Sequence, residues 1–520
     1  MTDELAGTRL LVRLALRRDR LLASVSIGAL VLLCYASAAA TAGLYGDEAE
    51  RVRAAEAINR SPAIVALYGP ILDVRSEGEL AMTKMTVLYA VFVAALFIVL
   101  LRRHTRVEEE AGRTELVGAG AVGRSAPLAA AALEAVALAA LLGVLVAAAN
   151  TAGGLDAAGS VAFGAVWAGT ALVAAGVAAV AAQLSASART CGAAAAGAVG
   201  AFFVVRAVGD TGPAWLSWCP PLGWNTQTRA YGDPRWWVLV LHPLLAAALL
   251  VVAAALQRRR DLGSGILSAR PGPAHGSPRL ADAITLAIQV HGAAVVLWTV
   301  AVGVLGVAFG MIAPGVGDLL DSGTAKELID KLGGLLVAAV LSMIAVVVSY
   351  FAVSVVARAG SDEGSGRTEL VLATATSRSR WLLATLLVAL LGAAWLLLVT
   401  GFGLEIGYVA ASGPDIGDLV VAALAWVPAV WVVAGLATLG FALRPGWTVA
   451  GWAWPALFLV LTLVAELLEL PSWVGDLSPY SHVPQVPAER WDWGAETGLL
   501  GVAAVLVAVA WWRFRGRDIG

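Results

Sequence analysis

Charged residues are scarce in this sequence, and their scarcity excludes most classes of soluble protein. Asp, Glu, Lys and Arg make up 14% of the 520 residues, whereas an ordinary soluble domain has roughly 25%. Most other positions carry Ala, Leu, Val or Gly. The apolar runs approach the ~20 residues that a helix needs to cross a bilayer. This composition predicts an all-α polytopic membrane protein.

Cysteine, histidine and lysine are also rare, and the shortage of each argues against a kind of site. The three cysteines, Cys34, Cys191 and Cys219, are mostly in or beside apolar runs, which disfavours a disulfide framework or a metal cage. No pair among the five histidines has zinc-site spacing. None of the three lysines ends a Gly-rich phosphate-binding loop. We therefore expect no catalytic, cofactor-binding or metal-binding residue in this chain.

Twelve apolar segments are long enough to be spans, and they form two sets of six. They are residues 21–44, 85–101, 126–149, 158–184, 191–208, 236–256, 292–312, 332–356, 381–401, 419–443, 448–468 and 497–512. The stretch between the sets is rich in Gly, Pro, Ser and Arg, as linkers are. We expect a first transmembrane half at 1–256, a cytoplasmic linker at 257–279 and a second half at 280–520.

Each half is expected to begin with an interfacial helix, which lies on the membrane surface. Residues 4–20 carry arginines at helical spacing; the alternative is a basic tail that only fixes orientation. Ser277 followed by Pro278 is a good start for the second such helix, with a capping hydroxyl before a first-turn proline. Pro428 and Pro455 are inside spans, where they are expected to kink the helix.

The placement of arginine predicts the orientation in the membrane. With the N-terminus inside, most arginines of the short loops are cytoplasmic, and the opposite loops are richer in acids. An even number of spans in each half then makes the halves parallel, related by an axis along the membrane normal. We expect a multi-pass protein of the plasma membrane with both termini in the cytoplasm.

One polar stretch occurs twice between apolar runs. It reads VEEEAGRTELV at 107–117 and GSDEGSGRTELV at 360–371, and each copy joins the second and third predicted spans of its half. The six identical residues start 254 positions apart (366 − 112 = 254), and Arg124 and Arg378 follow at the same distance. Six identities in a row, preceded by acids, indicate internal duplication. A solvated connector does not need such repetition, whereas docking sites for two like partners do.

This layout resembles the permease subunit of an ABC exporter of the class called type two, or type V. In that family an interfacial elbow helix precedes the first span, and a Glu-rich coupling helix joins the second and third spans. The resemblance implies coupling to an ATPase through Glu109, Glu110, Gly112, Arg113, Thr114, Glu115 and Leu116, and through Glu363, Gly366, Arg367, Thr368, Glu369 and Leu370.

The fused form with two times six spans resembles permeases that export polyketide antibiotics, the tetronasin-resistance type. Residues 215–237 and 477–491 are similar to loops of that subgroup. The resemblance implies two copies of a separate ABC ATP-binding subunit that holds ATP and Mg²⁺. It also implies membrane lipid and hydrophobic or amphipathic drugs as partners, and no nucleic acid. The first copy continues with VGAGAVGR and the second with VLATATSR, so the two dockings need not be equally strong.

Three residues are candidates for a substrate path: Glu134, Trp218 and Trp224. Glu134 is a charge inside a predicted span, and its alternative is a pairing with a neighbouring span. The two tryptophans could form an aromatic lid at the outer exit or simply an interfacial belt. Arg206 and His242 are near the outer ends of spans and are expected to reach water.

Other functions remain open on the sequence alone. Twelve spans in two parallel halves also suit an ion-coupled secondary transporter, although ionisable residues at mid-span are few and unpaired. An exporter of lipid or cell-envelope components is another alternative, and a membrane enzyme without a motor subunit is a third. An ATPase encoded beside this chain would favour the exporter.

Overall fold

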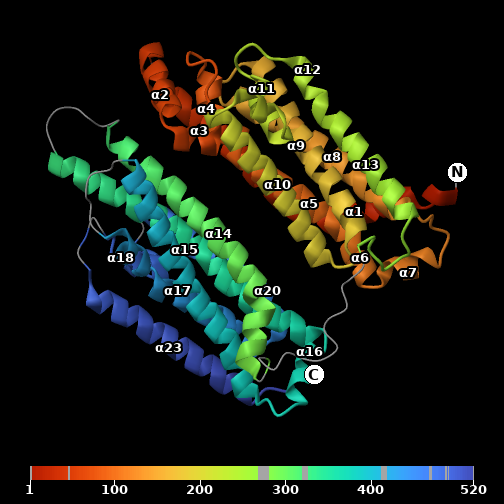
Figure 1. Ribbon diagram of the computed structural model, residues 1–520, viewed down its shortest axis with the longest axis vertical. Helices are drawn as coiled ribbons and strands as arrows, with labels where there is room; N and C mark the ends of the chain where they lie inside the picture. Colours follow the sequence, from red (N-terminus) through yellow and green to blue (C-terminus); the bar gives the residue numbers. More distant parts are fainter. Residues whose placement is uncertain are drawn as a thin grey trace. The chain divides into compact units, whose positions relative to one another are not determined.

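Every regular element in the part of the chain that the computed structural model describes is a helix, as the composition predicted. The described residues are 3–44, 47–267, 280, 282–318, 326–411, 418–467, 471–486, 489 and 491–518. The chain divides into two compact units, Met1–Gly272 (unit 1) and Pro273–Gly520 (unit 2), each with its own hydrophobic core (Figure 1). The division falls inside the range 257–279, between the two predicted halves.

Unit 1 contains six helical segments that are long and apolar enough to cross a membrane. They are α1 (Thr8–Leu44), α5 (Leu88–His104) with α6 (Arg106–Glu110), α8 (Ala126–Ala152), α9 (Ala157–Leu184), α10 (Ala188–Thr211), and α12 (Trp236–Leu239) with α13 (Leu241–Arg258). The shorter helices are η1 (Asp3–Leu5), α2 (Glu48–Arg60), α3 (Pro62–Tyr68), α4 (Glu77–Thr86), α7 (Arg113–Gly118), η2 (Ala214–Trp218) and α11 (Pro221–Gln227).

Unit 2 contains five such segments among its described residues. They are α14 (Ala283–Asp318), α15 (Lys326–Gly364), α17 (Arg378–Ala410), α18 (Leu419–Leu424) with α19 (Val427–Leu443), and α23 (Trp493–Arg515). The shorter helices are α16 (Arg367–Leu372), η3 (Pro445–Trp447), α20 (Thr448–Gly451), α21 (Ala453–Leu467), α22 (Ser472–Gly475) and η4 (Pro479–His482).

Glycines let helix backbones touch in both units. A Cβ atom at Gly164 of α9 would lie 2.2 Å from the carbonyl oxygen of Gly143 on α8. In unit 2, a Cβ at Gly407 of α17 would lie 2.2 Å from the carbonyl oxygen of Val307 on α14. Such distances leave no room for a side chain, and small residues allow this close packing in membranes. The helix that follows the duplicated stretch, α8 or α17, is thus packed tightly against a neighbour in each unit.

The described residues hold eleven candidate spans rather than about twelve. The eleventh predicted span, 448–468, is divided at Trp452 into α20 and α21, and neither reaches the length of a span within the described residues, which stop at Leu467 in this stretch. Pro455 is in the first turn of α21 and lacks the N–H that a continuous helix would use. Pro428 stands likewise in the first turn of α19, just after the break from α18. Both prolines therefore disturb helices, as predicted.

The two predicted interfacial helices are not separate elements. The first is the beginning of α1, which continues unbroken into its span because it contains no proline. The second is the beginning of α14. This helix starts behind Asp282, whose carboxylate accepts a hydrogen bond from the N–H of Thr285 at 2.8 Å, as an N-cap does. The start predicted at Ser277 and Pro278 is outside the described residues.

Candidate functional site

The duplicated stretch has the same backbone turn in both units. Loop 1 (residues 105–125) joins α5 to α8 and contains α6 and α7. Loop 2 (residues 362–378) runs from the last turn of α15 to the first residue of α17 and contains α16. A left-handed glycine precedes the second helix each time: Gly112 has φ 71° and ψ 0°, and Gly366 has φ 73° and ψ 2°. Glycine adopts this conformation at little cost, whereas other side chains are strained in it. The glycine of the motif therefore sets the turn that starts α7 and α16.

Each loop is at a defined end of its own unit. In unit 1, α6 and α7 lie at the end that holds the N-terminus, and α2, α3 and α11 lie at the other end (Figure 1). The N–H of Ser125 in loop 1 donates to the carbonyl of Glu4 at 3.1 Å. In unit 2, α16 lies at the end that holds the C-terminus (Figure 1). Each loop is therefore next to a terminal segment of the chain.

The first acid of each copy pairs with the arginine five residues later. Glu108 accepts from Nε and Nη2 of Arg113 at 2.7 and 2.9 Å. In unit 2, Asp362 accepts from Nη1 of Arg367 at 3.0 Å. The hydrogen bonds to Glu108 raise the pKa of the Arg113 guanidinium. Both pairs bridge the glycine turn and fix the angle at which α7 or α16 leaves the preceding helix.

The second acid of each copy pairs with an arginine just beyond the last helix of its unit. Glu109 binds Arg260, two residues past α13, through Nη1–Oε1 and Nη2–Oε2 contacts of 2.5 and 2.9 Å. Glu363 binds Arg517, two residues past α23, through a Nη2–Oε2 contact of 2.5 Å. Both carboxylates are nearly buried, with side chains 7% and 6% exposed. This pairing ties each loop to the end of the last helix.

A second arginine strengthens the same connection in both units. Nη2 of Arg124 donates to the carbonyl oxygen of Arg260 at 2.5 Å and to that of Gln257 at 3.2 Å. Nη1 of Arg378 donates to the carbonyl oxygen of Arg517 at 2.7 Å and to that of Arg515 at 3.4 Å. We call the acid, the arginine it binds and this donor the clamp: Glu109–Arg260–Arg124 in unit 1 and Glu363–Arg517–Arg378 in unit 2.

Loop 1 has further contacts with its own unit. Glu108 also binds Arg18 of α1 at 2.9 Å, and Glu110 accepts the N–H of Ala188 at the start of α10 at 2.8 Å. The N–H of Gly263 adds a 2.7 Å bond to Glu109. Residues 257–267, the described beginning of the predicted linker, are thus part of unit 1. At the position of Glu110, unit 2 has Gly364, which has no carboxylate.

The remaining motif residues form an outward face on α7 and α16. Leu116 and Leu370 are 78% and 73% exposed. Glu115 and Glu369 are exposed too, and no ion pair involves them within the described part of the chain. Thr114 is half-buried, whereas Thr368 is buried. We call Glu115 with Leu116, and Glu369 with Leu370, the outward face of each loop.

Beneath each outward face is a groove between the first and third spanning helices of the unit. In unit 1 it has a volume of about 70 Å³ and is lined by α1, α7 and α8, including Leu14, Thr114 and Ala131. In unit 2 it has about 220 Å³ and is lined by α14, α16 and α17, including Leu286 and Thr368. A displacement of α7 or α16 therefore acts directly on the packing of these helices.

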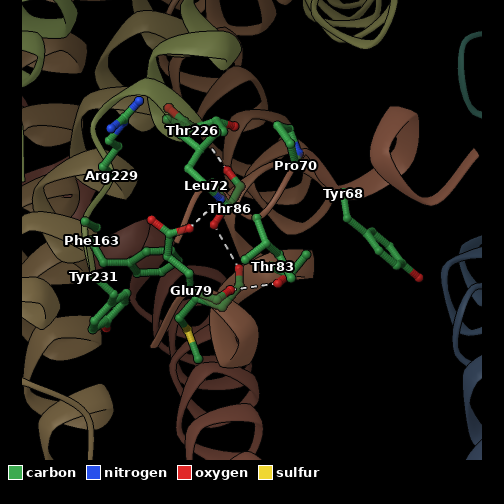
Figure 2. A pocket seen from close by; sticks show the side chains of 14 residues that line it. Tyr68, Pro70, Leu72, Glu79, Thr83, Thr86, Phe163, Thr226, Arg229 and Tyr231 are labelled. Carbon is green, nitrogen blue, oxygen red and sulfur yellow. Dashed lines mark hydrogen bonds between the residues drawn. The ribbon is translucent and has the colours of Figure 1, made fainter. Parts of the chain in front are cut away.

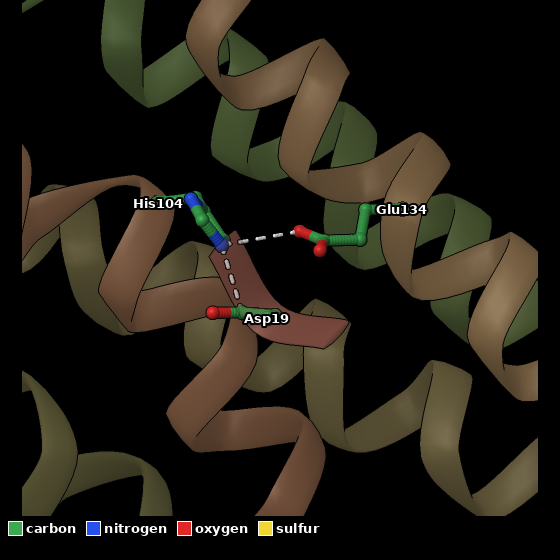
Figure 3. Close-up of side chains that lie close together, drawn as sticks. All are labelled: Asp19, His104 and Glu134. Atoms are coloured by element: carbon green, nitrogen blue, oxygen red, sulfur yellow. Dashed lines mark hydrogen bonds and ion pairs between the residues drawn. The ribbon is translucent and has the colours of Figure 1, made fainter. Parts of the chain in front are cut away.

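Glu134, a predicted substrate-path residue, is in a buried polar cluster of unit 1. Nε2 of His104 on α5 lies 2.8 Å from Oδ2 of Asp19 on α1 and 3.4 Å from Oε2 of Glu134 on α8 (Figure 3). Among the described residues, only these three offer His, Cys or carboxylate ligand atoms grouped within 4.8 Å of one another. Arg103 approaches Asp19 at 3.1 Å, and its charge competes with a metal ion for that carboxylate.

Trp218 and Trp224 are at the opposite end of unit 1, so they do not share a site with Glu134. The Nε1–H of Trp224 donates to the carbonyl of Trp218 at 2.8 Å, and Trp218 stacks on Trp237 at 5.7 Å. Both indoles are half-buried. The exposed tryptophans nearby are Trp215, Trp236 and Trp237. Trp218 and Trp224 thus fill space between η2, α11 and α12.

A small pocket at the same end has room for about one water molecule. Its volume is about 30 Å³, close to the share of one water in the liquid. Glu79 accepts the N–H groups of Leu72 and Asp73 at 2.7 and 2.8 Å beside it (Figure 2). Burial raises the pKa of the Glu79 carboxyl. These bonds fold the segment before α4, and the pocket is too small for a drug.

Arg206 and His242 do not reach water, contrary to the prediction. Both are 0% exposed. The guanidinium of Arg206 donates to the carbonyl of Ala66 at 2.6 Å and pairs with Asp210 at 2.9 Å. Nε2 of His242 lies 3.1 Å from Oδ1 of Asn225. The segments outside the spans fold over these side chains and provide the partners that water was expected to provide.

Comparison with known proteins relates the whole chain to one family. Residues 280–515 match the family described as "Multidrug efflux system permease Rv1217c, C-terminal domain". Over 530 residues the chain is 36% identical to the multidrug efflux system permease protein Rv1217c of Mycobacterium tuberculosis strain H37Rv. That match covers 99% of this chain and 95% of the relative, both loops included. The chain is a multi-pass membrane protein that belongs to the family of multidrug efflux system permeases.

Proposed function

We propose that this chain is the permease subunit of an ATP-driven ABC exporter, and that α7 and α16 dock two copies of a separate ATP-binding subunit in the cytoplasm. The observation that carries this proposal is that some of the repeated residues bind their own unit, whereas others are exposed and free to bind a partner. The acids and the downstream arginine form the clamp with the unit's own last helix. The outward face is repeated just as closely, although none of its side chains makes a hydrogen bond or ion pair with the described residues that would require repetition. Two like partners outside the chain supply a reason.

The outward face has the composition of a docking surface. Each is a leucine that is more than 70% exposed, next to a glutamate, on a helix of six residues. Burying such a leucine against a partner stabilises the complex by ~1.5–3 kcal/mol. The neighbouring carboxylate then favours a partner with a basic rim, which gives specificity more than affinity.

The contacts of loop 1 indicate how a displacement of α7 by the ATP-binding subunit would reach the spanning helices. The loop is joined covalently to α5 and α8, and the clamp joins it to the end of α13. Loop 2 has the corresponding connections to α15, α17 and α23. Packed helices respond to such a push as rigid bodies. In this proposal, closure of the ATP-binding subunits drives both loops and changes the packing of the spans.

The substrates in this proposal are hydrophobic or amphipathic drugs, with polyketide antibiotics among them. The support is the multidrug efflux description of the relative and the resemblance of the fused layout to antibiotic exporters. The chain transports and does not catalyse, and ATP and Mg²⁺ belong to the partner subunit. The two termini and both loops are cytoplasmic, as the arginine distribution favours.

Reversing the charge on both outward faces tests the proposal. We expect Glu115→Lys combined with Glu369→Lys to abolish drug-stimulated ATPase activity and co-purification of the ATP-binding subunit, because each docking surface acquires the wrong sign. The measurement uses the full chain co-expressed with the ATPase encoded beside it. A matched control, Glu50→Lys combined with Glu56→Lys, changes the net charge equally on exposed positions of α2 and leaves both readouts intact.

The opposite results are equally clear. If the double reversal at α7 and α16 leaves the complex and its ATPase activity unchanged, these helices do not dock the motor. If the purified chain moves drugs on a proton gradient without any ATPase, the protein is a secondary transporter and the proposal is overturned.

A further inference from the structure

A groove of about 280 Å³ is present between α1 and α8 in unit 1. Its lining starts at Asp19 and Glu134 and continues past Ile27, Leu138 and Leu145. The α1 residues of the lining, from Leu16 to Gly28, correspond to roughly 18 Å of helix at 1.5 Å per residue. The charged groups are thus near one end, and the rest of the lining is apolar apart from Ser24. Leu145 is 38% exposed, so the groove is open on one side of the unit.

The polar end of this groove holds a carboxylate that is incompletely paired. Glu134 is 1% exposed, and its Oε1 atom accepts no hydrogen bond from the described residues. Its other oxygen is 3.4 Å from His104, which is closer to Asp19. Asp19 has Arg103 as a second partner. Two carboxylates thus lie near one guanidinium, that of Arg103, which is bound to Asp19, and Glu134 has no arginine or lysine partner among the described residues.

We propose that the α1–α8 groove binds a lipophilic organic cation, with Glu134 as its counter-ion. The inference rests on the proposed exporter function and names its substrate class. A buried charge in a membrane segment is costly unless it is compensated, and a cation at Oε1 compensates it. The apolar body of the same molecule lies along Ile27, Leu138 and Leu145. Such pockets combine apolar walls with a few placed polar groups.

The alternative occupants fit the groove less well. A metal ion would need the Asp19 carboxylate, which Arg103 already occupies at 3.1 Å, and it would leave the long apolar wall unused. An organic anion would meet two carboxylates at the polar end. Arg20 also lines the groove, but it is exposed, where water solvates its charge. A cation with an apolar body uses both ends.

Binding of this cation should be linked to a proton. In the empty groove, a proton on Glu134 removes the charge that has no cationic partner. The other charged groups that face this site are Asp19 and Arg20 from α1 and Arg103 from α5. A bound cation makes that proton unnecessary, so binding releases it. The affinity for the cation therefore rises with pH, and this rise depends on Glu134.

Two probes of matched shape and opposite charge test the proposal. Tetraphenylphosphonium and tetraphenylborate are titrated into the purified full chain in phosphatidylcholine nanodiscs at pH 6, 7 and 8. We expect the phosphonium to bind more tightly, with an affinity that rises with pH. In Glu134→Gln we expect at least about a tenfold loss of phosphonium affinity, the change that 1.4 kcal/mol produces. The pH dependence disappears in that variant, and borate binding does not weaken.

Glu496→Gln is the matched control. Glu496 is a carboxyl of α23 that is 3% exposed and does not line this groove, and its substitution should leave both probes unaffected. If Glu134→Gln weakens both probes equally, Glu134 is only structural and the inference is overturned. If phosphatidylethanolamine in the nanodisc displaces the phosphonium, the groove is a lipid-headgroup site, and the inference is overturned as well.

This assay separates the inference from the exporter proposal. Binding to the permease alone needs no ATPase, so the Glu115→Lys and Glu369→Lys chain should bind the phosphonium normally. If phosphonium binding does not depend on Glu134 while drug-stimulated ATPase activity is intact, only the groove proposal is overturned. Retained binding in a chain that never engages an ATPase overturns only the exporter.

Discussion

At the scale of single residues, Gly112 and Gly366 fix where a short surface helix begins. Both have positive φ values, and a Cβ at either position would meet nothing within 4 Å. A substitution there is therefore opposed by the backbone conformation alone and not by a clash. The left-handed conformation costs other residues ~1–2 kcal/mol, which is enough to reorient α7 or α16 without unfolding the unit.

We expect Gly112→Ala to reduce drug-stimulated ATPase activity while the chain still inserts and purifies normally. The reason is that α7 would begin at a different angle and present Leu116 wrongly. Gly118→Ala is the control, because Gly118 belongs to α7 and also has open space around it. If Gly118→Ala impairs the ATPase as much as Gly112→Ala, the turn is not the cause.

The sequence predicted which residues of the two copies are equivalent, but not which residues they contact. The spacing indicated which residues are equivalent, but Glu109 and Glu115 looked alike as acids of one polar stretch. Glu109 is bound to Arg260, which is 151 residues away, and Glu363 to Arg517, which is 154 residues away. Such partners meet only through the tertiary fold. Docking through the thirteen motif residues stays a prediction.

At the scale of elements, the clamp is the connection that makes each loop part of its unit. The side chains of Glu109 and Arg260 are 7% and 6% exposed, so the pair is largely withdrawn from water. Removing one partner of a buried pair leaves a charge without compensation and costs ~3–5 kcal/mol. Replacing both by apolar groups is often close to neutral. The clamp is therefore a device for position more than for stability.

We expect Arg517→Met to lower the free energy of unfolding by ~3 kcal/mol, and Glu363→Leu added to it to restore much of that loss, because Glu363 has no second ion pair among the described residues. Unfolding in detergent, followed by circular dichroism, measures both. The surface pair Arg60–Glu56, 78% and 47% exposed, is the control and should contribute ~1 kcal/mol or less. A double variant no more stable than Arg517→Met alone would contradict a coupled pair.

Hydrophobic runs predicted the spanning elements well and their interruptions poorly. The runs were readable because burial in a bilayer requires near-continuous apolar sequence. The break at Val87 has no comparable local signal. The break at Val240 has one, because Pro243 in the first turn of α13 lacks the N–H that a continuous helix would use. The continuity of α1 was missed for the opposite reason: arginines at helical spacing suggested a surface helix, but no residue in this stretch breaks the helix.

At the scale of the whole molecule, each unit brings its loop, a chain terminus and the end of its last helix together. The sequence predicted two parallel halves from the repeat and from arginine counts. The side of the membrane on which each loop lies stays a prediction, because it depends on insertion and not on contacts within a unit.

We expect Leu116→Cys and Leu370→Cys to react with a membrane-impermeant maleimide only from the cytoplasmic side, and Trp215→Cys only from outside. All three positions are more than 65% exposed. Cys219 is exposed and is first replaced by Ser, whereas Cys34 and Cys191 are buried and can stay. Inside-out vesicles and intact cells provide the comparison.

Bound ATP-binding subunit should protect the cysteines at positions 116 and 370 and leave the one at 215 reactive. Labelling of positions 116 and 370 from opposite faces of the membrane would contradict parallel halves.

The unequal attachment of the two loops has a consequence for the transport cycle. Among the described residues, loop 1 is held by Arg18, Ala188 and Gly263 in addition to its clamp. Loop 2 adds an ion pair of Asp362 with Arg358 at 3.7 Å, and at the position of Glu110 unit 2 has Gly364. Two identical ATP-binding subunits that push equally on the two loops would therefore displace loop 1 less than loop 2. The less firmly attached loop 2 would move first. The permease, and not the ATP-binding subunits, would therefore set the order in which the two halves move in each turnover.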